Sequence, residues 1–79
     1  AELKLQSVLL EGHADERGST TFNLSLGEER AEAVREYLVD LGAMQGVFSI
    51  VTYGEERPFT RESNEEGWSK NRRVEFVVQ

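Results

Sequence analysis

The strongest constraint on the fold is an apolar stripe of helical period in the first half of the chain. The stripe consists of Leu24, Ala31, Val34, Leu38 and Leu41. The spacings of seven, three, four and three residues place these side chains on one side of an α-helix. Ser19 or Thr20 can cap the start of the helix, and Gly42 can end it. We therefore predict a long helix that begins near Thr20 and buries one side against another element.

Three segments around this helix have the composition of β-strands. Residues 7–14 form an apolar run before the helix, residues 47–54 are β-branched and aromatic, and residues 72–79 alternate between apolar and polar side chains. The polar stretch between the last two segments is too long for a tight hairpin, and residues 63–68 within it fit one short helical turn. The predicted fold class is α+β, with a helix on one face of a small sheet.

Alternation along the first and last strands predicts which side chains share a face. In the first strand, one set is Val8, Leu10 and Ala14, and the other is Leu9, Glu11, His13 and Asp15. In the last strand, the corresponding sets are Val74, Phe76 and Val78, and Arg73, Glu75 and Val77.

Composition narrows the classes of function. The formal charge is -6 and the pI is near 4.7, whereas binding to nucleic acid depends on an excess of Lys and Arg. The chain has no cysteine, which excludes disulfides, thiolate zinc sites and cysteine nucleophiles. No apolar run approaches the roughly 20 residues of a membrane-spanning helix, and we find no signal-peptide pattern in these residues. We expect a single domain that binds neither nucleic acid nor a cofactor or metal.

The junction between the first strand and the helix is the natural place for a binding site. The segment EGHADERGS, residues 11–19, sets a His, acidic side chains and an Arg around two glycines, and RAEAV follows at residues 30–34. Free backbone N–H groups at the start of a helix form a weak anion site beside the strand end.

Several motifs, in this order, resemble the OmpA-like peptidoglycan-binding domains. They are GHADERGS, FNLSLGEERAEAVREYL, SIVTYGEERP and SKNRRVEFVV. The resemblance runs from about Val8 to the C-terminus and is strongest to the peptidoglycan-associated lipoproteins of the Tol-Pal system. It implies a βαβαβ sandwich, with helices on one face of a small mixed sheet. It also implies a non-catalytic module that anchors the outer membrane to the cell wall, at the periplasmic face of the outer membrane of a Gram-negative bacterium.

The resemblance further implies a ligand, the meso-diaminopimelate residue of the peptidoglycan stem peptide. The positions that match the family's ligand-binding Asp and Arg are Asp15 and Arg30. Diaminopimelate carries an ammonium and a carboxylate on one carbon, so a carboxylate acceptor beside a planar guanidinium donor suits it. The alternative is a structural salt bridge between Asp15 and Arg30, which is the commoner arrangement when spacing alone is considered. Implied partners are TolB, with TolA as a further candidate, and the parent chain is expected to be lipid-anchored.

Two departures from the family pattern stand out. Phe22 replaces the usual Tyr, which removes a hydroxyl group and keeps the ring. The family's first strand and most of its first helix have no counterpart, so AELKLQ is expected to be the end of that helix, and the domain, residues 1–79, to be N-terminally truncated. Leu3, Leu5 and part of the Val74–Val78 face are then expected to lack cover.

Three further residues are assigned to the ligand site with less support from the pattern. His13 shares a strand face with Asp15, and Asn23 lies two helical turns before Arg30. Arg73 begins the last strand and is preferred to Arg72, because alternation sends the two to opposite faces. Alternative roles are a structural role for His13, a backbone hydrogen bond for Asn23 and protection of an edge strand for Arg73. Asn71 is expected to cap the preceding loop, and a metal site at His13 is not favoured.

Two other functions compete with wall binding. A carboxylate-based hydrolase could use Glu11, Asp15 or Glu16, but these acids lie on one strand end and the adjacent turn, and no deep cleft is predicted. A protein-interaction module of the Tol-Pal system, with wall binding secondary, is the other alternative.

Overall fold

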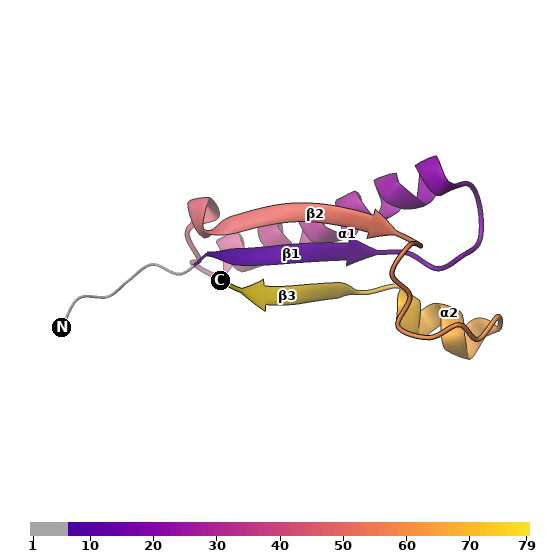
Figure 1. Cartoon of the computed structure of the whole chain (residues 1–79). Coiled ribbons are helices and arrows are strands. Elements are labelled where there is room, and N and C mark those ends of the chain that lie inside the picture. The colour runs from indigo at the N-terminus through magenta and orange to yellow at the C-terminus, as the bar shows by residue number, and fades with distance from the viewer. Residues whose placement is uncertain (1–6) are drawn as a thin grey trace.

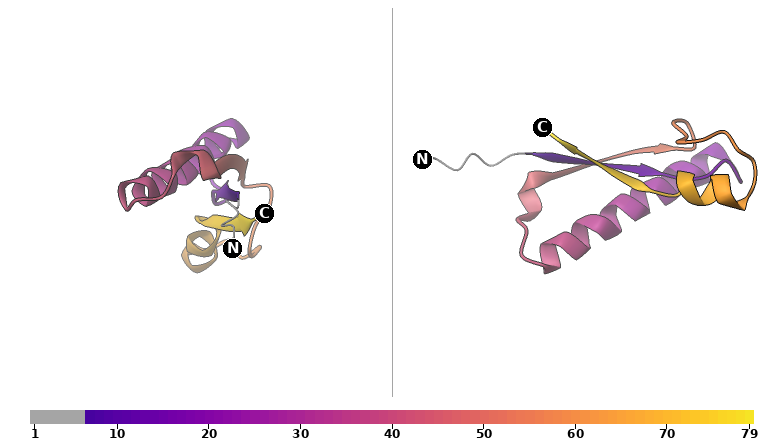
Figure 2. Two further views of the ribbon diagram at one scale, coloured as in Figure 1. Left: turned by 90° about the vertical axis from the view of Figure 1, so that its left-hand side faces the viewer. Right: turned by 90° about the horizontal axis from the view of Figure 1, so that it is seen from below.

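Residues 7–79, which the computed structural model describes, form a three-stranded sheet with two helices (Figure 1). The elements are β1 (Val8–His13), α1 (Thr20–Asp40), the 3-10 turn η1 (Gln45–Val47), β2 (Phe48–Gly54), α2 (Glu65–Asn71) and β3 (Val74–Val78). The strand order is β2-β1-β3, with β1 parallel to β2 and antiparallel to β3. The end-on view of Figure 2 shows both helices on the same side of the sheet. The predicted α+β class with a mixed sheet is confirmed.

The boundaries of α1 agree with the prediction because both of its ends are set by local chemistry. The Ser19 hydroxyl accepts a hydrogen bond from the Phe22 backbone N–H at 3.2 Å, and the helix starts at Thr20. Gly42 takes a φ of 109°, and its N–H donates to the Val39 carbonyl oxygen at 2.9 Å. Only a residue without Cβ adopts this φ at low cost, so the glycine ends the helix.

The second helix begins later and is longer than the helical turn predicted over residues 63–68. Asn64 caps it by accepting from the Gly67 N–H at 2.8 Å. It ends at Asn71, so Arg72 is its C-cap residue and not the first residue of the last strand. This shift decides which of the two neighbouring arginines reaches the site described below.

The central strand β1 is buried on both faces near its C-terminal end. Gly12, His13 and Ala14 are all buried, whereas the alternating pattern predicted that His13 would lie on a polar face. The helix α1 covers one face. On the other, Arg57 and Phe59 of the segment after β2 border a cavity together with His13. A central strand that is covered on both sides buries both of its alternating sets.

Two glycines allow α1 to pack very closely on β1. A Cβ at Gly12 would overlap the Gly27 carbonyl oxygen, and a Cβ at Gly27 would overlap the Thr52 hydroxyl oxygen. The Thr52 hydroxyl also donates to the Leu24 carbonyl oxygen at 2.8 Å, which ties α1 to β2. This close approach places the first half of α1 directly beside the end of β1.

The outer strand β3 is poorly covered by side chains. The helix α1 lies against β1 and β2 and has few contacts with β3. Phe76 is 54% exposed and Val78 is 63% exposed, although both lie on the face predicted to be apolar. The prediction about Leu3 and Leu5 falls outside the described residues. Among residues 7–79, no helix is long and apolar enough to cross a membrane.

Candidate functional site

A pocket of about 340 Å³ lies where β1 leads into α1. Three guanidinium groups, one carboxylate, two apolar side chains and a glycine line it. The lining residues are Asp15, Arg17, Gly18, Phe22, Leu26, Arg30 and Arg72. The residues come from the segment after β1, the first half of α1 and the end of α2. The structure therefore brings to one pocket Asp15 and Arg30, the two residues that the family resemblance assigned to the ligand site.

Asp15 is the most heavily bonded side chain in this pocket. Its Oδ1 accepts from the Arg17 backbone N–H at 3.0 Å and from Arg17 Nε at 3.2 Å. Its Oδ2 accepts from Arg17 Nη2 at 2.9 Å and from Arg72 Nη1 at 3.1 Å. The carboxylate is only 9% exposed, so these four donors replace most of its water.

The bonded environment also fixes the charge of Asp15. The side-chain hydrogen bonds from Arg17 are the largest cause, and they lower the pKa of Asp15 to about 2 against the opposing effect of burial. The same contact raises the pKa of Arg17, and Glu65 together with Asp15 raises that of Arg72. Asp15 is consequently a carboxylate at any physiological pH.

Arg30 reaches the pocket without pairing with Asp15. Its Nη1 donates to the His13 carbonyl oxygen at 2.9 Å. Within residues 7–79, the ion pairs of Asp15 are with Arg17 and Arg72, and none joins it to Arg30. The alternative of a structural Asp15–Arg30 salt bridge is therefore wrong. Because a guanidinium carries five N–H donors, Arg30 retains donors that can reach a ligand.

The other predicted residues lie around the pocket and not in its lining. The buried Asn23 side chain donates from Nδ2 to Glu55 Oε1 at 2.8 Å. The His13 ring borders a separate cavity, which Arg73 also borders. Arg73 Nε donates to Glu75 Oε2 at 2.5 Å and Nη2 to the Arg57 carbonyl oxygen at 3.0 Å. Strand alternation does not apply to the two neighbouring arginines, since both precede β3 (Val74–Val78), and Arg72, not Arg73, contacts Asp15.

The contribution of α2 was missed by the sequence analysis. Trp68 Nε1 donates to Glu16 Oε1 at 3.1 Å, and the Arg17 guanidinium lies over the Trp68 ring at 4.3 Å. Ser63 also donates to Glu16, at 2.7 Å. On the other side, Arg72 Nη2 donates to Glu65 Oε1 at 2.6 Å. In the sequence, only the motif NRRV, residues 71–74, pointed to a contribution from this region. The position of α2 relative to the site follows from tertiary packing, which the motif does not record.

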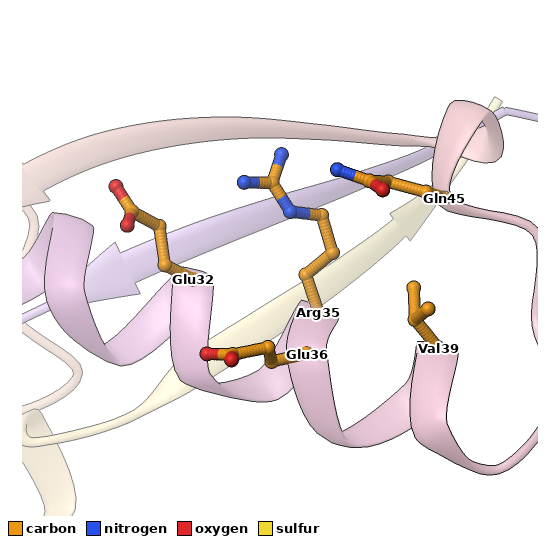
Figure 3. A pocket seen from close by; sticks show the side chains of 5 residues that line it. All are labelled: Glu32, Arg35, Glu36, Val39 and Gln45. Carbon is orange, nitrogen blue, oxygen red and sulfur yellow. The ribbon is translucent and has the colours of Figure 1, made fainter.

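The remaining hollows of the described residues differ in character. One of about 200 Å³ adjoins the site and is lined by Ala14, Glu16, Glu55, Pro58, Thr60, Arg61 and Asn71. Another, of about 310 Å³, lies at the opposite end between α1 and η1, where Gln45 points toward Arg35 (Figure 3). None of the predicted site residues lines this distant groove. Among residues 7–79, no three His, Asp or Glu side chains are grouped to hold a metal ion.

Comparison with known proteins identifies the family. The model of the OmpA family matches residues 1–72. The chain belongs to the OmpA family. It is 50% identical over 71 residues to a peptidoglycan-associated lipoprotein of Pseudomonas aeruginosa, covering 90% of this chain and 42% of that protein. It is 47% identical over 67 residues to the protein of the same name from Pasteurella multocida, covering 85% of this chain and 45% of that protein. The chain thus spans less than half the length of these relatives.

Solved structures support the same assignment. The peptidoglycan-associated lipoprotein of Burkholderia pseudomallei superposes with a TM-score of 0.90 at 40% identity, over 94% of this chain and 63% of that chain. The C-terminal domain of MotB from Helicobacter pylori superposes with a TM-score of 0.88 at 25% identity, over 98% of this chain and 60% of that chain. The fold of this OmpA-family chain is therefore shared with proteins of different names.

Proposed function

We propose that this OmpA-family chain binds peptidoglycan and that its pocket takes the meso-diaminopimelate residue of the stem peptide. The observation that carries the proposal is that Asp15 and Arg30 line one pocket without bonding to each other. A buried carboxylate and a guanidinium thus face one pocket, and their charges match the ammonium and the carboxylate on the same ligand carbon. Phe22 and Leu26 add apolar surface for the methylene chain between the two ends of diaminopimelate. The names of the relatives, peptidoglycan-associated lipoproteins, support the same ligand class.

Calorimetric titration of the chain with a diaminopimelate-containing stem peptide tests this proposal. We expect Arg30→Ala to lose about 2 to 5 kcal/mol of binding free energy, because it removes one side of a partly desolvated charge pair. The matched control is Arg35→Ala, on the same helix but in the distant groove of Figure 3, which should bind as the wild type does. A stem peptide with lysine lacks the second carboxylate and should bind at least about tenfold more weakly. Folded Arg30→Ala protein that binds as tightly as wild type would refute the assignment.

The proposed role is non-catalytic. A glycosidase needs one carboxyl group that stays protonated near neutral pH to act as an acid, whereas the pKa of Asp15 is lowered to about 2. Glu11 borders a different cavity, and Glu16 is bonded to Ser63 and Trp68. Turbidity of purified sacculi discriminates the two functions, because a binding module sediments with the sacculi and leaves their turbidity unchanged.

We also propose that TolB engages the surface beside this pocket and competes with the wall. This surface comprises residues 15–18 and the loop 54–60, and Glu16 and Glu55 line the hollow that adjoins the Asp15 segment. The charged side chains of Glu16, Arg17 and Glu55 can give complementarity to a protein partner. Binding of TolB and of the stem peptide in one titration, each with its affinity unchanged by the other, would contradict competition. Association with TolA, a lipid anchor on the parent chain and location in the Gram-negative cell envelope remain predictions from the family resemblance.

A further inference from the structure

The Asp15 carboxylate has no acceptor position left for a ligand. A carboxylate offers about four lone-pair positions, and four donor groups already occupy those of Asp15. A ligand ammonium can reach this carboxylate with normal geometry only if one of the present donors leaves. The question is which donor yields.

Arg72 is held too firmly to yield. It bridges Asp15 at 3.1 Å and Glu65 at 2.6 Å, and its side chain is only 27% exposed. Movement of Arg72 would break both ion pairs and would leave Asp15 with donors from a single residue. The backbone N–H of Arg17 is also fixed, since it belongs to the turn that follows the strand.

The side chain of Arg17 has the opposite properties. It is 52% exposed, and the residue directly precedes Gly18, which has a φ of 91°. Its guanidinium already lies over the Trp68 ring at 4.3 Å, and a cation over an aromatic face is stabilised without a carboxylate partner. Release from Asp15 would therefore free two acceptor positions while Arg17 keeps a favourable contact.

We propose that Arg17 occupies the ammonium position of the site as an internal competitor, and that its release from Asp15, with its contact to Trp68 kept, selects ligands with a free amine. Arg72 is the permanent partner that keeps Asp15 in place. The inference rests on the proposed function, and it adds that the site exchanges one cation for another. A ligand without a cationic group cannot displace Arg17. The site should therefore reject stem peptides whose diaminopimelate amine is acylated, as it is in a peptide cross-link.

The exchange predicts opposite effects for the two arginines. Arg17→Gln removes the competing charge, and because a half-exposed ion pair is weak, affinity for a stem peptide with a free diaminopimelate amine should rise only about two- to fivefold. Arg17→Lys keeps a cation and should stay close to wild type. Arg72→Gln should weaken binding at least about tenfold, because Asp15 loses its fixed partner.

Titration of the wild type and these three variants, with the free-amine stem peptide and its Nε-acetylated form, tests the inference. The acetylated peptide should bind weakly to the wild type, and Arg17→Gln should not improve its binding. If Arg17 were merely structural, or a direct contact to the ligand carboxylate, Arg17→Gln would weaken binding of the free-amine peptide, and that result would overturn the inference. Failure of the proposed function looks different, because the wild type would then bind neither peptide, or Arg30→Ala would bind like wild type. Circular dichroism of each variant confirms that it is folded.

Discussion

The segment that follows β1 and the outer strand β3 are built in opposite ways. At the first, the buried Asp15 carboxylate accepts from Arg17 of the same segment and from Arg72 at the end of α2, and the buried Asn71 of α2 bonds the backbone of residues 59 and 60 nearby. At the second, Phe76 and Val78 are more than half exposed, and the strand is held mainly by its backbone pairing with β1. The difference shows that the pocket beside Asp15 is formed without side chains of β3.

The largest expected effect comes from the close contact beneath the site. Gly27→Ala would set a methyl group against the Thr52 hydroxyl and the Gly12 backbone, and two backbones cannot both give way. We expect a loss of about 3 kcal/mol or more in the free energy of unfolding, measured by urea denaturation. Gly46→Ala is the matched control, because a Cβ there meets no atom within 4 Å. If the two variants proved equally stable, the close approach of α1 would not be needed to form the site.

The next effect concerns the buried amide that supports the segment before α2. Asn71 Oδ1 accepts from the N–H groups of Phe59 at 2.7 Å and Thr60 at 3.1 Å, and its Nδ2 donates to the Thr60 carbonyl oxygen at 2.9 Å. Asn71→Ala should cost about 2 to 3 kcal/mol, because buried backbone groups lose their partners. Ser69→Ala, on the exposed side of the same helix, should change stability by less than about 0.5 kcal/mol. Equal thermal melting of the two variants would contradict this account.

A smaller effect should appear as pH dependence. Burial is the largest cause that lowers the pKa of His13, and Arg73 adds to it. The folded-state pKa of His13 lies below the unfolded value of 6.5. The contribution of neutral His13 to the free energy of unfolding is therefore fully present above about pH 7 and is lost as the pH falls below 6.5. Between pH 7 and 5.5 we expect a loss of up to about 1 kcal/mol in urea denaturation. His13→Gln should remove this slope; a slope of the same size in that variant would assign it to other groups.

The smallest effect is expected on β3 and would sharpen the comparison directly. Val78→Thr replaces an exposed methyl group by a hydroxyl and should alter the free energy of unfolding by less than about 0.5 kcal/mol. In contrast, Leu10→Ala on the paired central strand, at 0% exposure, should cost about 2 to 5 kcal/mol. If Val78→Thr were as damaging as Leu10→Ala, the outer strand would be covered in solution, for instance by a second copy of the chain, which sedimentation analysis would detect.

Sequence reasoning succeeded where the determining chemistry is local. The start of α1 follows from the Ser19 cap, and its end follows from Gly42. Asp15 and Arg30 were placed in one site by the family resemblance, and the structure brings them to one pocket. Alternation was less informative for His13, because burial on both faces of a central strand depends on segments distant in sequence.

The chain by itself determined the elements and the fold class, because caps and periodicity act within a few residues, whereas Asp15 and Arg30 were selected by the family resemblance of its motifs. Only the tertiary structure decided which side chains surround that pair. The C-terminal end of α2 had to be placed before Arg72 could be seen to reach Asp15, and Trp68 had to be placed before Arg17 could be seen to have a second partner besides Asp15. These contacts join residues more than 50 positions apart, and side-chain hydrogen bonds at such separations follow from packing, which no local pattern records.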